Sequence, residues 1–223
     1  MQYLYKVDNG FYLDIGANEP DMLSVTKMFY DAGWSGINVE PLPTEHKKLV
    51  DARPRDINIL AAAGSAEKKQ TLYVWGRAGV LSTLRADMAR KNRGLPRHTV
   101  SVKNTTALAR EAIDLEVQPI HFCKIDVEGY EGEVLRGIDF KVLRPWIFVI
   151  EANRDLVTRK GETFPVWQDI LLNNGYTYTE TDKLNRYYVD NNRPELIKQR
   201  LSRADVLSMY DITSSMTKKK IPQ

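Results

Sequence analysis

The chain has 223 residues, 43% of them hydrophobic, which is enough to bury one sizeable core and favours a single domain. Its formal net charge of +3 is too small to predict binding to nucleic acid, and no stretch approaches the ~20 consecutive apolar residues of a membrane span. The first ten residues lack the apolar core of a signal peptide, and the single cysteine, Cys123, excludes an internal disulfide. We therefore expect a soluble cytoplasmic protein.

Residues 11–41 have the pattern of a strand, a tight turn, a helix and a second strand. Residues 11–18 and 36–41 hold short apolar runs, and residues 21–32 place apolar side chains at helical spacing. A parallel pair of strands needs a crossover helix of about this length. Asp14 closes the first strand and Glu40 the second, and ligands of open α/β sheets bind beyond the carboxyl ends of strands. The pattern predicts a βαβ unit that binds a nucleoside.

The turn after the first strand disfavours a dinucleotide, because Asn18 and Pro20 stand where the later glycines of a pyrophosphate-binding turn would fall. A carboxylate such as Glu40 can accept hydrogen bonds from both ribose hydroxyls, and Asp14 can bind an ammonium group directly or through water. These groups suit S-adenosylmethionine, which has a ribose, an amino-acid tail and a sulfonium but no phosphate. The alternative is that both carboxylates merely cap helices or face solvent.

Next in the chain we expect a helix that follows Pro43, runs through His46 and Leu49 and ends at about Ala52, and a third strand over residues 57–64. That strand ends in the small residues Ala61-Ala62-Ala63-Gly64, which would leave room for a flat ring, although ordinary close packing explains them equally well.

The pattern loosens over residues 67–97, and we interpret this segment as an insertion with short strands. Loops on a rigid scaffold usually carry specificity, so Trp75, Ser82, Thr83 and the arginines are candidate acceptor contacts, with a solvated surface as the equal alternative.

The second half of the chain repeats the alternation of strands and helices. We expect strands over residues 100–103, 121–126 and 146–150, helices over residues 106–117, 131–137 and 167–172, and a closing hairpin over residues 176–181 and 186–189. Four strands thus deliver acidic residues to one edge of the sheet: Asp14, Glu40, Asp126 with Glu128, and Glu151. Unpaired carboxylates repel one another unless a cation lies between them, and a sulfonium, an ammonium or a metal ion would serve.

Five segments in this order resemble the FkbM family of S-adenosylmethionine-dependent methyltransferases. They are residues 11–18, 36–41, 62–64, 81–84 and above all 124–131, which read Lys-Ile-Asp-Val-Glu-Gly-Tyr-Glu. The resemblance covers about residues 10–189, and it departs from many members at Pro20, where they have glycine. It implies a class I, Rossmann-like three-layer α/β fold with a seven-stranded, mostly parallel sheet whose last strand is antiparallel.

The resemblance also implies methyl transfer from S-adenosylmethionine to a hydroxyl of a sugar, a polysaccharide or a natural-product acceptor. By the match, Asp14, Gly16, Ala17 and Asn18 would line the methionine end of the cofactor, Glu40 and Pro41 the ribose, Ala62 the adenine and Asp126 the sulfonium region. The candidate acceptor contacts are Ser82, Thr83, Asn153 and Asn185.

A sulfonium methyl is already activated, so the main task of the protein is to align the acceptor oxygen, which can supply roughly 7–11 kcal/mol. A base within reach should add about 10²–10⁴-fold. The candidate bases are Glu128 and Glu151, with His98 as the one histidine of three that could reach an acceptor. We predict that the site holds no metal. The alternative is a magnesium ion whose oxygen ligands would include Asp126, Glu151 and Asn153.

We expect a methyltransferase domain over residues 1–192 and a basic C-terminal tail or helix over residues 193–223, which carries seven basic and three acidic residues. The expected partner is a small-molecule or glycan acceptor, and the oligomeric state stays open. Two other functions remain: a dinucleotide-dependent sugar oxidoreductase with the same βαβ unit, and an inactive binding module in which Pro20 blocks the cofactor.

Overall fold

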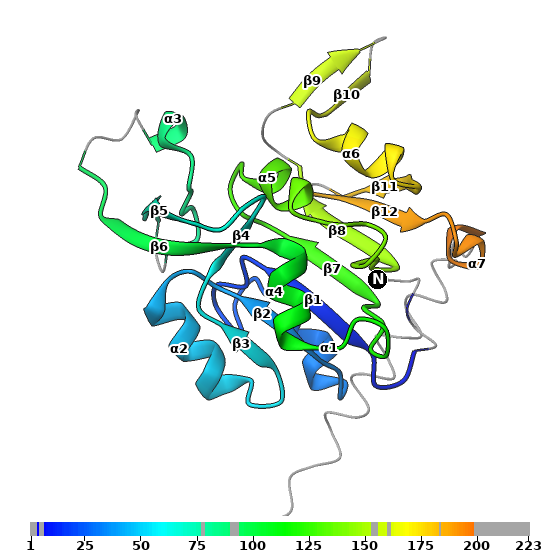
Figure 1. The fold of residues 1–223 in the computed structure, drawn as a ribbon, viewed down its shortest axis with the longest axis horizontal. Helices are drawn as coiled ribbons and strands as arrows, with labels where there is room; N and C mark the ends of the chain where they lie inside the picture. Colours follow the sequence, from blue (N-terminus) through cyan, green and yellow to red (C-terminus); the bar gives the residue numbers. More distant parts are fainter. Residues whose placement is uncertain are drawn as a thin grey trace, which may run out of the picture.

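The structure is a computed structural model that describes residue 4 and residues 7–76, 79–89, 94–152, 156–159, 162–182 and 184–198. Its body is a seven-stranded sheet with the order β11-β12-β8-β7-β1-β2-β3, which can be followed across Figure 1. These strands are β1 (Phe11–Ile15), β2 (Ser35–Val39), β3 (Ile57–Ile59), β7 (Phe122–Ile125), β8 (Ile147–Glu151), β11 (Tyr176–Thr181) and β12 (Asn185–Asp190).

The strands from β3 to β8 in this order are parallel to their neighbours, and β12 is antiparallel to both β8 and β11. The expected Rossmann-like α/β sheet, mostly parallel with its last strand antiparallel, is therefore confirmed. Strand β1, which lies between β7 and β2, is buried along its whole length, as a strand covered on both faces should be.

Helices cover both faces of the sheet. The helices are α1 (Lys27–Asp31), α2 (Pro43–Ala52), α3 (Ala86–Ala89), α4 (Thr105–Ala112), α5 (Glu131–Arg136), α6 (Gln168–Asn173) and α7 (Pro194–Lys198). Leu13 of β1 belongs to one buried cluster with residues of α4, α5 and α6, whereas Tyr12 belongs to a second cluster with Phe29 of α1 and Leu196 of α7. Neighbouring side chains of a strand point to opposite faces, so the chain forms three layers.

A second, three-stranded sheet has the order β4-β6-β5, with β4 (Ala62–Gly64) parallel and β5 (Lys68–Tyr73) antiparallel to β6 (Arg97–Asn104). The prediction of one continuous strand over residues 57–64 was wrong, because β3 pairs with β2 whereas β4 pairs with β6. The chain turns between them, where the N–H of Ala61 donates to the carbonyl of Ile59.

Two predicted helices are shorter in the structure. The crossover helix was expected from residue 21, but α1 begins at Lys27, since Leu23 has a φ of 60° that a right-handed helix does not allow. The helix expected to end at residue 117 ends at Ala112, because Ile113 is extended. The hairpin of β9 (Leu156–Arg159) and β10 (Glu162–Pro165), which extends beyond the main sheet in Figure 1, was not predicted.

Of the predicted C-terminal segment 193–223, the structure describes residues as far as 198, and they include α7; the rest lies outside the described residues. Within the described ranges, the structure contains no helix with the length and apolarity that crossing a membrane requires.

Candidate active site

A cavity of about 310 Å³ lies at the carboxyl ends of β1, β2, β7 and β8. Its volume falls at the lower end of the ~300–1,000 Å³ range of ligand pockets. Predicted site residues that line this cavity are Gly16, Ala17, Asn18, Glu40, Pro41, Ala62, Ser82, Asp126, Glu128, Glu151 and Asn185. The four parallel strands therefore bring most of the predicted residues together at one edge of the sheet.

The other predicted residues lie elsewhere. Asp14 and Thr83 are buried behind the cavity wall, and neither side chain lines the cavity. His98 is exposed on β6 and is not part of the lining, so the structure does not bring this candidate base to the cavity. Asn153 lies outside the described residues. Pro20 is buried and does not line the cavity either.

The turn after β1 depends on Gly16, whose φ is 81°. A Cβ at this position would lie 1.9 Å from the backbone oxygen of Asp126, so any side chain would separate the ends of β1 and β7. The N–H groups of Gly16 and Ala17 both donate to the carbonyl of Val39, at 3.0 and 3.2 Å. The turn is therefore fixed against the ends of both neighbouring strands.

Glu40 connects this turn to the end of β2. Its Oε2 accepts a hydrogen bond from the N–H of Asn18 at 2.9 Å, and its Oε1 accepts one from the N–H of Leu42 at 2.8 Å. The side chain is only 3% exposed, and burial raises its pKa to about 7 despite these two hydrogen bonds. Each carboxylate oxygen has a second lone pair, so both can also accept a hydroxyl from a ligand in the cavity.

A buried lysine that the sequence reasoning did not assign a role lies between the strand ends. Lys124 of β7 lines the cavity, and its Nζ lies 3.2 Å from Oδ2 of Asp126 and 3.8 Å from Oδ1 of Asp14. Burial lowers the pKa of Lys124, but Asp126 and Asp14 outweigh burial and raise it. The available signal was a lysine inside an apolar strand, two residues before an aspartate and hence on the same face.

Asp14 therefore faces Lys124 rather than the cavity. The two residues are partners in the parallel register of β1 and β7. The other carboxylate oxygen, Oδ2, accepts a hydrogen bond from the hydroxyl of Thr26 at 2.6 Å.

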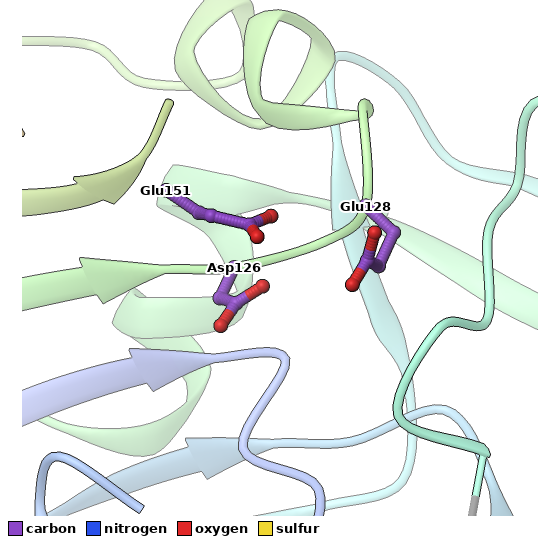
Figure 2. Close-up of side chains that lie close together, drawn as sticks. All are labelled: Asp126, Glu128 and Glu151. Carbon is purple, nitrogen blue, oxygen red and sulfur yellow. The ribbon is translucent and has the colours of Figure 1, made fainter. Parts of the chain in front are cut away.

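Three carboxylates form an acidic cluster at the ends of β7 and β8. Asp126, Glu128 and Glu151 each place a carboxylate oxygen so that the three lie within 4.8 Å of one another, and Figure 2 shows them pointing toward the same space. Burial and the charges of Asp126 and Glu128 raise the pKa of Glu151 to about 8. A carboxylate with such a pKa can take up or release a proton near neutral pH, which is typical of catalytic sites.

The loop that carries Glu128 is held by two neighbours. Glu131 Oε1 accepts hydrogen bonds from the N–H groups of Val127 and Gly129, at 3.3 and 3.0 Å. The hydroxyl of Thr83 donates to the carbonyl of Glu128 at 2.8 Å. Thr83 thus positions the loop, whereas the adjacent Ser82 lines the cavity with a buried Oγ that has no hydrogen-bond partner among the described residues.

Backbone strain is concentrated around the cavity. Among the described residues, the non-glycine residues with positive φ are Asn9, Asn18, Leu23 and Glu128. The last three of these line the cavity. Asparagine tolerates this conformation, whereas it costs about 1–3 kcal/mol each at Leu23 and Glu128, and such residues cluster at functional sites.

A family model of the methyltransferase FkbM domain matches residues 14–178, which confirms the resemblance inferred from the sequence. Among solved structures, the chain is similar to the crystal structure of methyltransferase FkbM from Methylobacillus flagellatus KT, with 13% sequence identity and a TM-score of 0.45. The similarity covers 83% of this chain and 45% of that one, so the chain spans less than half the length of the relative. A search of curated proteins found no match.

Proposed function

Because this chain belongs to the FkbM methyltransferase family, we propose that it is an S-adenosylmethionine-dependent O-methyltransferase whose acceptor is a hydroxyl of a sugar, a polysaccharide or a natural product. The observation that carries the proposal is the cavity itself, which joins the turn after β1, the carboxylate of Glu40 and the acidic cluster. Along its wall, Glu40 can accept hydrogen bonds from the ribose hydroxyls and the carboxylate of Asp126 suits a cationic sulfonium. A carboxylate of the acidic cluster can receive the proton of the acceptor hydroxyl.

The residues present fit S-adenosylmethionine. Glu40 offers both carboxylate oxygens to the ribose hydroxyls, and Ala62 and Ala63 leave space for a flat base. At the other end, Asp126 presents a carboxylate of the sign that a sulfonium requires, and Nζ of Lys124 lies 3.2 Å from that carboxylate. The turn at Gly16, Ala17 and Asn18 would face the amino-acid tail.

When bound, S-adenosylmethionine supplies a methyl group that is already activated by its sulfonium. The work left to the protein is to position the acceptor oxygen and to receive its proton. Ser82, whose Oγ is otherwise unpaired among the described residues, and Asn185 are candidate contacts to the acceptor. Glu151, with a pKa of about 8, is our first candidate for the base, and Glu128 is the second.

Isothermal titration of S-adenosylhomocysteine into the wild-type protein tests this proposal, beside the variants Glu40→Ala and Glu40→Gln. Glu40 also binds two backbone N–H groups, so circular dichroism is needed to show that each variant is folded. Glu67→Ala, at an exposed position, is the matched control. We expect about micromolar binding by the wild type and by the control, and binding at least about tenfold weaker in both Glu40 variants.

Titration of NAD in parallel tests the oxidoreductase alternative. Binding of NAD without binding of S-adenosylhomocysteine would favour that class, and binding of neither would leave an inactive module. Either result would overturn the proposed activity. With S-adenosylhomocysteine binding established, transfer of a labelled methyl group to a panel of sugars and natural products identifies the acceptor.

A further inference from the structure

Arg53 is a charged residue that the fold buries almost completely. It follows the last residue of α2, and its exposed fraction is only 1%. Burying a guanidinium costs several kcal/mol unless its hydrogen bonds compensate. The hydrogen-bond partners of Arg53 therefore indicate its role in the fold.

Among the described residues, every hydrogen bond that its guanidinium donates goes to one short segment, residues 20–26. Arg53 Nη1 donates to Oγ1 of Thr26 at 2.7 Å, and Nη2 donates to Oγ of Ser24 at 2.7 Å and to the carbonyl of Pro20. Pro20 and Thr26 mark the two ends of the segment, so one side chain holds both ends and the middle.

This segment forms one wall of the cavity. Met22, Leu23 and Val25 line it, and the side chains of Met22 and Leu23 are 57% and 85% exposed, so packing against the core does not fix them. Leu23 also has the left-handed backbone conformation, with a φ of 60°. A segment outside regular structure, with exposed apolar side chains and a strained residue, needs another restraint to keep a single position.

The same contacts connect Arg53 to the charged groups at the strand ends. The hydroxyl of Thr26 accepts from Arg53 and donates to Asp14 at 2.6 Å, and Asp14 lies 3.8 Å from Nζ of Lys124. A hydrogen-bonded hydroxyl with one donor and one acceptor is fully oriented. The wall segment is thus tied both to Arg53 and to Asp14, which lies behind the cavity wall.

We propose that Arg53 is a positioning residue that holds residues 20–26 as the wall of the cofactor cavity. The identity of the ligand rests on the proposed function, whereas the restraint on the wall does not. A lysine cannot replace it, because a single ammonium on a flexible stem does not present the rigid fork that reaches Pro20, Ser24 and Thr26 together.

The chain provides a matched control two residues later. Arg55 stacks on the ring of Tyr30, with its Cζ 3.8 Å from the ring centroid, and donates to the carbonyl of Tyr30. It is exposed, and its hydrogen bonds go to Tyr30 and Trp34 rather than to residues 20–26. Arg55→Met therefore removes an arginine from the same loop while leaving the wall in place.

The test combines amide hydrogen exchange with titration of S-adenosylhomocysteine for the wild type, Arg53→Met, Arg53→Lys and Arg55→Met. In Arg53→Met we expect exchange over residues 21–26 to be at least about tenfold faster and binding at least about tenfold weaker. Arg53→Lys should recover most of the melting temperature but little of the affinity, which separates positioning from a purely structural role. Arg55→Met should exchange and bind like the wild type.

If Arg53→Met does not fold, Ser24→Ala replaces it, because this change removes one of the three partners of Arg53 and should raise exchange in the same segment to a smaller degree. Unchanged exchange over residues 21–26 in a folded Arg53→Met or Ser24→Ala variant overturns the proposal, as does equal loosening in Arg55→Met. A wild type that fails to bind S-adenosylhomocysteine while Arg53→Met still loosens the wall would refute the proposed function and leave the role of Arg53 standing.

Discussion

The ammonium nitrogen of Lys124 lies 3.2 Å from the carboxylate of Asp126, inside the wall of the cavity. Lys124 is 5% exposed, and its other charged neighbour, Asp14, is 1% exposed. The lysine therefore compensates the buried carboxylate of Asp14 and the carboxylate of Asp126, whose side chain is 35% exposed. Without it, the ends of β1 and β7 would carry uncompensated negative charge at the point where a cationic ligand is expected.

Replacing Lys124 by methionine should lower the free energy of unfolding by about 3–5 kcal/mol, because the buried Asp14 would lose its compensating charge. Urea denaturation measures this. Lys103→Met is the control, since Lys103 is partly exposed and pairs with Glu111 at the surface, and we expect it to cost less than about 1 kcal/mol. Equal losses in the two variants would refute the compensating role of Lys124.

The pKa of Glu151 predicts how stability depends on pH. Folding raises it from 4.5 to about 8, so between these values the folded state binds more protons than the unfolded state. The free energy of unfolding should therefore fall as the pH rises through this window. Glu151→Gln should show a smaller loss of stability between about pH 6 and about pH 8 than the wild type, measured by urea denaturation.

Glu133→Gln is the control for this slope, because the pKa of Glu133 is lowered by its hydrogen bonds to Ser65 and Arg136. The ionised Glu133 therefore stabilises the folded state at neutral pH. This contribution is lost only at acid pH, as the pH falls below the usual pKa of a glutamate. A Glu151→Gln variant with the slope of the wild type would show that Glu151 does not titrate in this window.

The raised pKa of Glu151 also predicts how the rate of methyl transfer depends on pH. With any acceptor that the protein methylates, the rate should rise with pH through about 8 as Glu151 loses its proton and becomes able to accept one. Glu151→Gln should lower the rate by about 10²–10⁴-fold and remove this rise. A variant that keeps the rise would move the role of base to another group, with Glu128 next in line.

Gly16 and Gly94 give a matched pair of substitutions by alanine. Both have positive φ, 81° and 94°, but a Cβ at Gly16 would meet the backbone oxygen of Asp126 at 1.9 Å, whereas one at Gly94 would meet no atom of the described residues within 4 Å. Gly16→Ala should cost about 3–5 kcal/mol through strain and overlap together, and Gly94→Ala only about 1–2 kcal/mol through strain. Similar thermal midpoints for the two would contradict the close approach of β1 and β7.

The variant Leu23→Asn should be more stable than the wild-type protein. Asparagine tolerates the left-handed conformation that Leu23 adopts at a φ of 60°. We expect a gain of about 1 kcal/mol in unfolding free energy, because Leu23 is 85% exposed and little packing is lost. Met22→Asn, at an exposed neighbour without positive φ, should change stability by less than about 0.5 kcal/mol. A loss of stability in Leu23→Asn would show that the side chain packs on the cavity wall.

The sheet and its acidic edge could be predicted from the sequence because the buried parallel strands are mostly apolar and short. Residues 147–150 are an uninterrupted apolar run, whereas the strands over residues 11–15, 35–39 and 122–125 each contain at least one polar residue. Each strand has a carboxylate at or next to its carboxyl end, and these are Asp14, Glu40, Asp126 and Glu151. Parallel strands end at the same edge, so the position of Glu40, Asp126 and Glu151 around one cavity follows from connectivity alone.

What the sequence did not reveal depends on contacts between distant residues. Arg53 is an ordinary surface residue by its type, and its burial follows from hydroxyl and carbonyl partners some thirty positions away in the chain. His98 lies on a strand whose exposed face carries it away from the cavity, and strand periodicity alone does not say which face is covered. The predicted crossover helix begins later than expected because Leu23 has a left-handed backbone conformation. The helix propensity of leucine gives no sign of this conformation.

The left-handed backbone conformations at Asn18, Leu23 and Glu128 also limit where this protein can be made more heat-resistant. Methods that replace each residue by the one best suited to its local conformation would choose glycine or asparagine at the last two positions. Such changes gain stability where the cavity wall is formed, so each gain there should be checked against ligand affinity. Thermostabilising substitutions are better sought on α2, α4 and the exposed face of β6, where local optimisation and function do not compete.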